Sequence, residues 1–169
     1  MARDFGERAD FKEIYAAHFV SLTTQLCAYL GDRQEAQDVV QEAFCRALQR
    51  WPRLRGYDDP VAWVRRVAWN LATSHTRRLR VAAAFRRRQR GEHHPPPGPD
   101  RVVLIAALRE LPERQRHALV LHYLADLPVA EIARAMHAAE GTVKVWLHRG
   151  RAALAARLGL DTLTEDSHV

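Results

Sequence analysis

Cysteine, lysine and long apolar stretches are all scarce in this chain of 169 residues. The two cysteines, Cys27 and Cys45, lie within helical patterns at no metal-ligand spacing. They indicate buried thiols in a reducing compartment rather than a disulfide framework. No apolar run approaches the roughly 20 residues of a membrane-spanning helix, and the opening segment MARDFGERAD lacks the features of a signal peptide. We therefore expect a cytoplasmic protein with no membrane insertion.

Clusters of side chains that could catalyse a reaction or bind a metal are also lacking. The nine histidines are scattered, and the only adjacent pair, His93 and His94, has no matching set of cysteines or carboxylates. A helical enzyme would have to use the Asp58–Asp59 pair or the histidines, but no spacing pairs a nucleophile with a base. We expect no enzyme activity, no metal and no cofactor.

Lysine occurs only at positions 12 and 144, so 24 of the 26 basic residues are arginines. The net charge of the chain is +6. Nine of these arginines, and no acidic residue, lie between Val61 and Arg90. A coding bias could raise the total number of arginines but would not gather them in one segment. Because guanidinium groups bind phosphates and stack on bases, this segment is typical of a surface for a polyanion such as nucleic acid.

The first eighty residues show the period of three helices, near 11–30, 32–50 and 61–80. Gly31 can end the first helix, Asp32 can cap the second, and Pro60 can start the third. An apolar stripe along each helix predicts the core of one bundle. The predicted core residues are Phe11, Ile14, Tyr15, Phe19, Leu22, Leu26, Tyr29, Val39, Val40, Phe44, Leu48, Val64, Val67, Ala68 and Leu71.

The composition changes abruptly after residue 80. Residues 81–99 pass from arginine to a Pro/Gly-rich stretch that is too stiff and polar to pack, which predicts a linker. Helical patterns return over 100–110, 113–125, 129–136 and 140–158, and residues 159–169 form a tail with little that could pack. Pro112 and Pro128 stand at helix starts. With no strand pattern and no repeat, we expect an all-α protein of two small helical domains joined by a flexible linker.

Residues 129–158 have the pattern of a helix-turn-helix. The apolar positions of the short first helix and of the longer second helix each fall on one face. They are Ile132, Ala133 and Met136, then Val143, Leu147, Gly150 and Leu154. Helical geometry places Lys144, Val145, His148 and Arg149 on the opposite face, where they suit base edges and phosphates of a major groove. An amphipathic hairpin with a solvated basic side would show the same pattern.

Aromatic residues and arginines alternate in WVRRVAWN, residues 63–70. Unpaired bases stack on aromatic rings while arginines bind phosphates, so this combination suits single-stranded DNA. Asn70 can bond a base edge. Core packing is the alternative for either Trp63 or Trp69.

Together these segments resemble the bacterial sigma factors of the extracytoplasmic-function (ECF) group, within the sigma-70 family. The segment DRQEAQDVVQEAF is similar to the family's helix that binds core RNA polymerase, and WVRRVAWNLATSHTRRLR to its segment that melts and reads the −10 element. The segment LPERQRHALVLHYLADLPVAEIARAM, with GTVK and LHR after it, is similar to the domain that reads the −35 element. The resemblance implies a region 2-like domain over 8–80, a linker over 81–99, a region 4-like helix-turn-helix domain over 100–158 and a tail over 159–169.

The resemblance also implies partners and residue roles. Core RNA polymerase would bind Asp38, Gln41, Glu42 and Phe44. The −10 element, including its unpaired non-template strand, would meet Tyr57, Trp63, Arg65, Arg66, Asn70, Arg77 and Arg78. The −35 duplex would meet Thr142, Lys144, Val145, His148 and Arg149. An anti-sigma protein is a further candidate partner. The alternative function is a stand-alone helix-turn-helix regulator, which would bind duplex DNA tightly without polymerase.

Several residues depart from the family's pattern. Gln37 replaces a frequent acidic residue, and His137 stands in the turn where glycine is usual. The usual serine caps are replaced by Pro128 and Ala139, and an arginine frequent in the recognition helix is replaced by Trp146. A small polar residue is common where Val145 stands. These departures leave the −35 sequence undefined, but they do not change the expected mode of binding.

Overall fold

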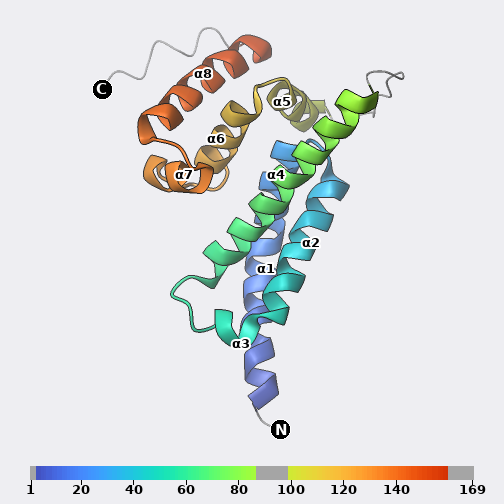
Figure 1. Cartoon of the computed structure of the whole chain (residues 1–169), viewed down its shortest axis with the longest axis vertical. Helices are drawn as coiled ribbons and strands as arrows, with labels where there is room; N and C mark the ends of the chain where they lie inside the picture. Colours follow the sequence, from blue (N-terminus) through green and yellow to red (C-terminus); the bar gives the residue numbers. More distant parts are fainter. Residues whose placement is uncertain (1–2, 87–98, 160–169) are drawn as a thin grey trace. The chain divides into compact units, whose positions relative to one another are not determined.

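The computed structural model describes residues 3–86 and 99–159 (Figure 1). Its elements in those ranges are all helices, which confirms the all-α prediction. They are α1 (Arg3–Leu30), α2 (Arg33–Gln49), α3 (Trp51–Leu54), α4 (Pro60–Arg86), α5 (Pro99–Arg109), α6 (Glu113–Tyr123), α7 (Val129–Met136) and α8 (Glu140–Leu158). They divide into two compact units, Met1–His94 and Pro95–Val169. Among the described residues, no helix combines the length and apolar character needed to cross a membrane.

In the N-terminal unit, α1, α2 and α4 pack side by side, and the short α3 follows α2 (Figure 1). Phe44 of α2 is the centre of an aromatic cluster and is only 2% exposed. The centroids of its ring and those of Phe11, Tyr15 and Phe19 on α1 lie 6.1, 4.9 and 6.2 Å apart. Trp51 of α3 closes the cluster at 5.3 Å from Phe11. Because rings of this size bury large apolar areas, this cluster fixes α2 against α1.

The turn between α1 and α2 confirms the expected cap of the second helix, and α4 starts at Pro60 as predicted. Gly31 has a φ of 80°, which lets the chain reverse after α1 at little cost. The side chain of Asp32 then accepts a hydrogen bond from the backbone N–H of Glu35 at 3.0 Å. At the start of α4, the Asp59 carboxylate accepts a hydrogen bond from the backbone N–H of Ala62 at 2.8 Å. Helix α2 therefore begins at Arg33, and α4 begins at Pro60.

The expected end of the third helix at residue 80 is wrong, because α4 continues to Arg86. Residues 81–86 read VAAAFR, and this alanine-rich segment contains no helix breaker. The remainder of the expected linker, residues 87–98 with His93 and His94, lies outside the described residues, as do residues 160–169 of the expected tail.

Two expectations of burial on α2 are also wrong. Leu48 is 51% exposed, and Cys45 is exposed whereas Cys27 is half-buried. The buried stripe of α2 consists of Ala36, Val40, Ala43, Phe44 and Ala47. Small residues form much of this stripe, so the helix approaches its neighbours along alanines rather than along its largest apolar side chains.

In the C-terminal unit, α6 packs against both α7 and α8, and its central residues are buried. The starts of α6 and α7 directly after Pro112 and Pro128 confirm the expected helix starts. Helix α7 ends at Met136, and the next residue, His137, adopts the left-handed conformation with φ 50° and ψ 50°. Glycine adopts this conformation without steric cost, whereas a residue with a Cβ atom loses about 1 kcal/mol there. Ala139, the residue before α8, provides no side-chain hydrogen bond to cap that helix.

Gly150 allows the close approach of α8 to α6. A Cβ atom at Gly150 would lie 2.9 Å from Leu119 Cδ1 and 3.2 Å from Leu119 Cγ, whereas a Cβ at Gly141 would meet nothing within 4 Å. We predict that Gly150→Val lowers the free energy of unfolding of the C-terminal unit by about 1–3 kcal/mol through overpacking. Gly141→Val, on the same helix, is the matched control and should not destabilise. Hydrogen exchange of the α6 and α8 amides checks this, and equal protection in both variants would contradict it.

His117 makes the stability of the C-terminal unit depend on pH. It lies in α6 at 9% exposure. Burial, together with the nearby charges of Arg114 and Arg116, lowers its pKa from 6.5 to about 3. Below pH 6.5 the unfolded chain therefore takes up a proton that the folded chain does not, so stability falls as the pH falls.

We predict a loss of at most about 2 kcal/mol from this group on going from pH 6.5 to pH 5. His117→Gln should remove this part of the pH dependence, whatever its effect at neutral pH. Urea unfolding across that pH range measures the slope. His148→Gln, which changes an exposed histidine of α8, is the control and should leave the His117 contribution in place. An unchanged slope in the His117 variant would refute the assignment.

Candidate nucleic-acid and protein interfaces

The outer face of α2 carries the acidic and amide side chains expected to meet a protein partner. Asp38, Gln41 and Glu42 are all exposed. The two carboxylates accept hydrogen bonds from residues of the same helix. Asp38 accepts from Gln34 Nε2 at 3.1 Å, and Glu42 accepts from Arg46 Nε at 2.7 Å. Solvent-exposed pairs of this kind contribute little to stability, so a cationic partner can compete for both carboxylates, although Arg46 partly offsets the charge of Glu42.

Phe44, which was expected on the same interface, lies instead in the core with its ring among those of α1. A direct contact of Phe44 with a protein partner, as expected from the sequence, therefore does not fit its burial. The ring supports α2 from within, and this support holds the exposed side chains in place. In the sequence, Phe44 lies close to the acidic residues, but helical periodicity turns it about 115° around α2 from the middle of Asp38, Gln41 and Glu42, towards α1.

Helix α4 collects most of the residues expected to bind single-stranded DNA into one stripe. At 100° per residue, Trp63, Arg66, Asn70 and Arg77 lie within about 60° of one another around the helix, and Arg78 lies beside them. Arg66, Asn70, Arg77 and Arg78 are exposed, and Trp63 is half-buried. The guanidinium of Arg50 lies 5.8 Å from the centroid of the Trp63 ring. We call Trp63, Arg66, Asn70, Arg77 and Arg78 the α4 stripe.

Two residues near this stripe face elsewhere. Trp69 is 6% exposed and packs edge-on against Tyr29 at 5.1 Å, so it belongs to the core. Arg65 lies about 150° around α4 from the middle of the stripe and is half-buried. The structure therefore does not bring Arg65 together with the other expected DNA-binding residues.

Tyr57 lies in the loop between α3 and α4 and is 55% exposed. Its backbone N–H donates to Leu54 O at 3.0 Å, and Asp59 caps α4 two residues later. These bonds hold the loop while the ring remains open to solvent. The arrangement therefore offers an aromatic face near the start of the α4 stripe.

Helix α8 presents all five of its expected DNA-binding residues on its exposed side, whereas Val143, Leu147 and Gly150 are buried. We call Thr142, Lys144, Val145, His148 and Arg149 the α8 face. Trp146 is half-buried beside this face, with the guanidinium of Arg114 5.7 Å from its ring centroid. Arg114 also donates to Met136 O at 3.5 Å. Trp146 therefore links α8 to α6 and does not stand among the exposed groups.

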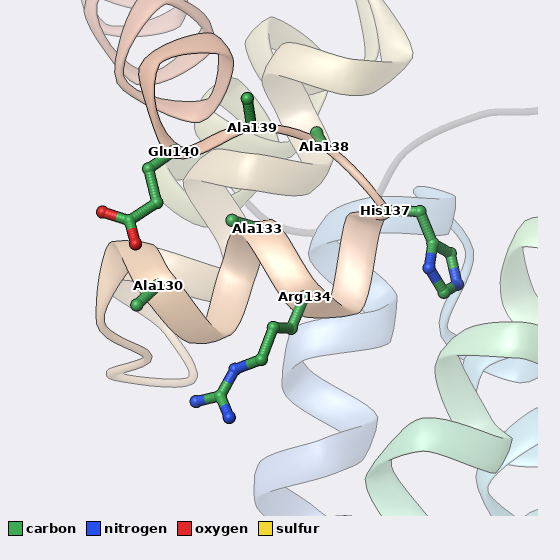
Figure 2. Close-up of a pocket in the computed structure, with 7 residues that line it drawn as sticks. All are labelled: Ala130, Ala133, Arg134, His137, Ala138, Ala139 and Glu140. Atoms are coloured by element: carbon green, nitrogen blue, oxygen red, sulfur yellow. The ribbon is translucent and has the colours of Figure 1, made fainter.

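The turn between α7 and α8 contains an open hollow, shown in Figure 2. Four alanines line it, and Arg134, His137 and Glu140 project outward around them (Figure 2). Alanine methyl groups offer a small substrate few points of attachment. We therefore regard the hollow as the corner of the helix-turn-helix and place no ligand in it.

Sequence reasoning missed two arginines that flank the α8 face, Arg114 and Arg151. Arg151 follows Lys144 by seven residues, a spacing that returns to the same side of a helix, and this signal could have identified it. Arg114 belongs to α6, so only the packing of α6 against α8 reveals its position beside Trp146.

Comparison with known proteins gives two matches in the order expected. The family described as Sigma-70 region 2 matches residues 14–81, and Sigma-70, region 4 matches residues 101–154. The ECF RNA polymerase sigma factor SigC of Mycobacterium tuberculosis is 31% identical over 156 residues, which cover 86% of this chain and 84% of SigC. SigW of Bacillus subtilis is 28% identical over 171 residues, with 89% and 88% coverage.

Among solved structures, the sigma factor RpoE of Bartonella quintana, in complex with the anti-sigma factor NepR, is similar in fold, with a TM-score of 0.75. The match has 22% identity and covers 90% of this chain and 98% of that one. The two sigma-70 regions and the extent of the identity to SigC show that the chain belongs to the ECF group of sigma-70-family RNA polymerase sigma factors, which direct the polymerase to promoters.

Proposed function

We propose that this sigma factor divides promoter recognition among three helices. Helix α2 binds core RNA polymerase, α4 holds unpaired bases of the −10 element, and α8 reads the −35 duplex. The observation that carries the proposal is the α4 stripe, in which an indole, an amide and several guanidinium groups share one face. The associated domain limits are 8–80, 81–99, 100–158 and 159–169, with α4 extending into the linker as far as Arg86.

The α4 stripe supports a mechanism of promoter opening by binding alone, without covalent chemistry. Unstacked bases can pack on the rings of Trp63 and Tyr57, and such stacking contributes roughly 1–3 kcal/mol per base. Arg66 and Arg77 can bind the phosphates of the same strand, and Asn70 can bond a base edge. Because these groups favour the unpaired strand over the duplex, their binding shifts the equilibrium towards the open promoter.

The α8 face supports recognition of duplex DNA through the major groove. Arg149 and Lys144 can bind guanine or phosphate, and Val145 can contact a thymine methyl group. The residues of this face come from more than two turns of one helix, which is the usual reach of a recognition helix in the groove. This mode of binding requires no cofactor.

The acidic side of α2 supports the proposed docking on polymerase. Since Asp38 and Glu42 are exposed in a chain of net charge +6, they provide a surface of opposite sign to the DNA-binding helices. Such a patch favours a cationic protein surface over nucleic acid. Core polymerase is a cytoplasmic enzyme in bacteria, so the proposal places this chain in the cytoplasm. By analogy with RpoE and NepR, an anti-sigma protein is proposed as a further partner.

Core binding and promoter-dependent transcription test the proposal directly. We predict that Asp38→Arg with Glu42→Arg lowers affinity for core polymerase at least about 10-fold, because it replaces attraction with repulsion across the interface. Pull-down with core polymerase and run-off transcription measure the two activities. Glu13→Arg, which reverses an exposed acid on α1, is the control and should bind normally. If the wild-type chain neither binds core polymerase nor yields a promoter-dependent transcript, the proposal fails.

The position of Arg65 provides a sharper test of promoter opening. We predict that Arg66→Ala or Arg77→Ala lowers open-complex formation about 10-fold, since each removes a phosphate contact from the α4 stripe. Permanganate reactivity of −10 thymines measures opening, and footprinting of the closed complex measures binding. Arg65→Ala removes the same charge from another side of α4 and should open promoters nearly normally. Equal defects in the Arg65 and Arg66 variants would show that the stripe is not the binding surface.

A further inference from the structure

Arg151 on α8 is bound by a neutral hydroxyl group. Its Nη1 donates to the Tyr123 hydroxyl oxygen at 3.2 Å. Tyr123 is the last residue of α6 and is 50% exposed, and Arg151 is exposed as well. Within the described residues, no carboxylate forms an ion pair with Arg151. The hydroxyl therefore orients the guanidinium without neutralising its charge.

Arg157, on the same helix, shows the contrasting arrangement. Its Nε donates to a carboxylate oxygen of Glu110, the residue directly after α5, at 3.0 Å, and its Nη1 donates to Ala153 O at 3.3 Å. Arg151 thus joins α8 to α6, and Arg157 joins α8 to the residue that follows α5. Only the charge of Arg157 is paired with a carboxylate, and a paired guanidinium attracts a phosphate less strongly.

The position of Arg151 places it beside the α8 face. It lies seven residues after Lys144, about 20° around the helix and about 10 Å along it. On the axis of α8 it therefore follows the residues that enter the groove, at the flank of their face. A groove is bordered by sugar–phosphate backbone on both sides, so a cation at the flank meets phosphate and not base edges.

We propose that Arg151 and Tyr123 form a subsite for one backbone phosphate of the −35 duplex. The Arg151 guanidinium binds the phosphate oxygens through donors that the tyrosine leaves unused, and the Tyr123 hydroxyl can donate its own hydrogen to the same phosphate. Because the hydroxyl already orients Arg151, less side-chain entropy is lost on binding. The subsite fixes the register of α8 on the duplex and reads no sequence. This inference rests on the proposed role of α8 at the −35 element.

The salt dependence of binding tests the subsite. The probe is a duplex promoter fragment found by mapping the 5′ ends of transcripts, bound by holoenzyme reconstituted from core polymerase and the full chain. We expect Arg151→Ala to reduce the slope of log affinity against log salt by about 0.9, which is the value for one lost phosphate contact. Affinity at low salt should fall about 10-fold, and equally on fragments with the natural and with an altered −35 sequence.

Three further variants separate the possible causes. Tyr123→Phe keeps the charge of Arg151 and the aromatic ring, so the slope should stay at the wild-type value while affinity falls about 2- to 5-fold. Arg157→Ala removes a paired arginine from the same helix and should change neither quantity. Lys144→Ala, on the α8 face, should weaken binding and serves as the positive control.

The outcomes distinguish the subsite from the proposed function. If Lys144→Ala weakens binding while Arg151→Ala behaves like Arg157→Ala, the phosphate subsite is overturned and the −35 role of α8 stands. If neither the Lys144 nor the Arg151 variant changes binding, α8 does not contact the promoter, and the proposed function of the C-terminal unit fails together with the subsite. A lower slope in Arg151→Ala alone among the arginine variants supports the subsite.

Discussion

The functional helices of this protein are held by narrow buried stripes in which small residues are prominent. On α2 the stripe includes Ala36, Ala43 and Ala47, and on α8 it includes Gly150, whose missing side chain lets Leu119 approach. Small residues bring helix axes close together, so each helix is fixed by a limited part of its circumference. The rest of the circumference remains exposed, which is the condition for a helix to bind a partner on its outer side. The acidic side of α2 and the α8 face both depend on this constraint.

Charge then assigns different partners to these exposed faces. The carboxylates of Asp38 and Glu42 lie on the outer side of α2, where Arg46 pairs with Glu42, whereas the exposed basic groups of the α4 stripe and the α8 face have no carboxylate among their members. One chain thereby presents an anionic surface that suits a protein partner and cationic surfaces that suit DNA, and such a difference in charge disfavours binding of the wrong partner to each face. Salt should weaken the DNA contacts steeply because each bound phosphate releases counterions.

The sequence predicted the helices of the C-terminal unit closely because Pro112 and Pro128 mark two of the helix starts in that half of the chain. It also predicted the exposed side of α8, since one buried stripe determines the opposite side. It did not predict the side chains whose environment depends on another helix. Trp63 and Trp69 have the same residue type and similar neighbours in the sequence, and only the contact with Tyr29 places Trp69 in the core. Leu48 was expected in the core because periodicity gives a direction but no packing partner, whereas the 100° spacing of a helix already separates Arg65 from the α4 stripe.

The departures of this helix-turn-helix from its family have a common physical consequence. His137 occupies a left-handed position and Ala139 provides no side-chain cap, so the turn has little local stabilisation of its own. Arg114 supplies a link from outside the motif, since it donates to Met136 O and lies over Trp146. Trp146 stands where the family often has an arginine, and because it is half-buried in this link it adds no exposed charge to the α8 face. Recognition at the −35 element should therefore depend more on phosphate contacts made from the flanks of α8, and the orientation of those flanks depends on α6.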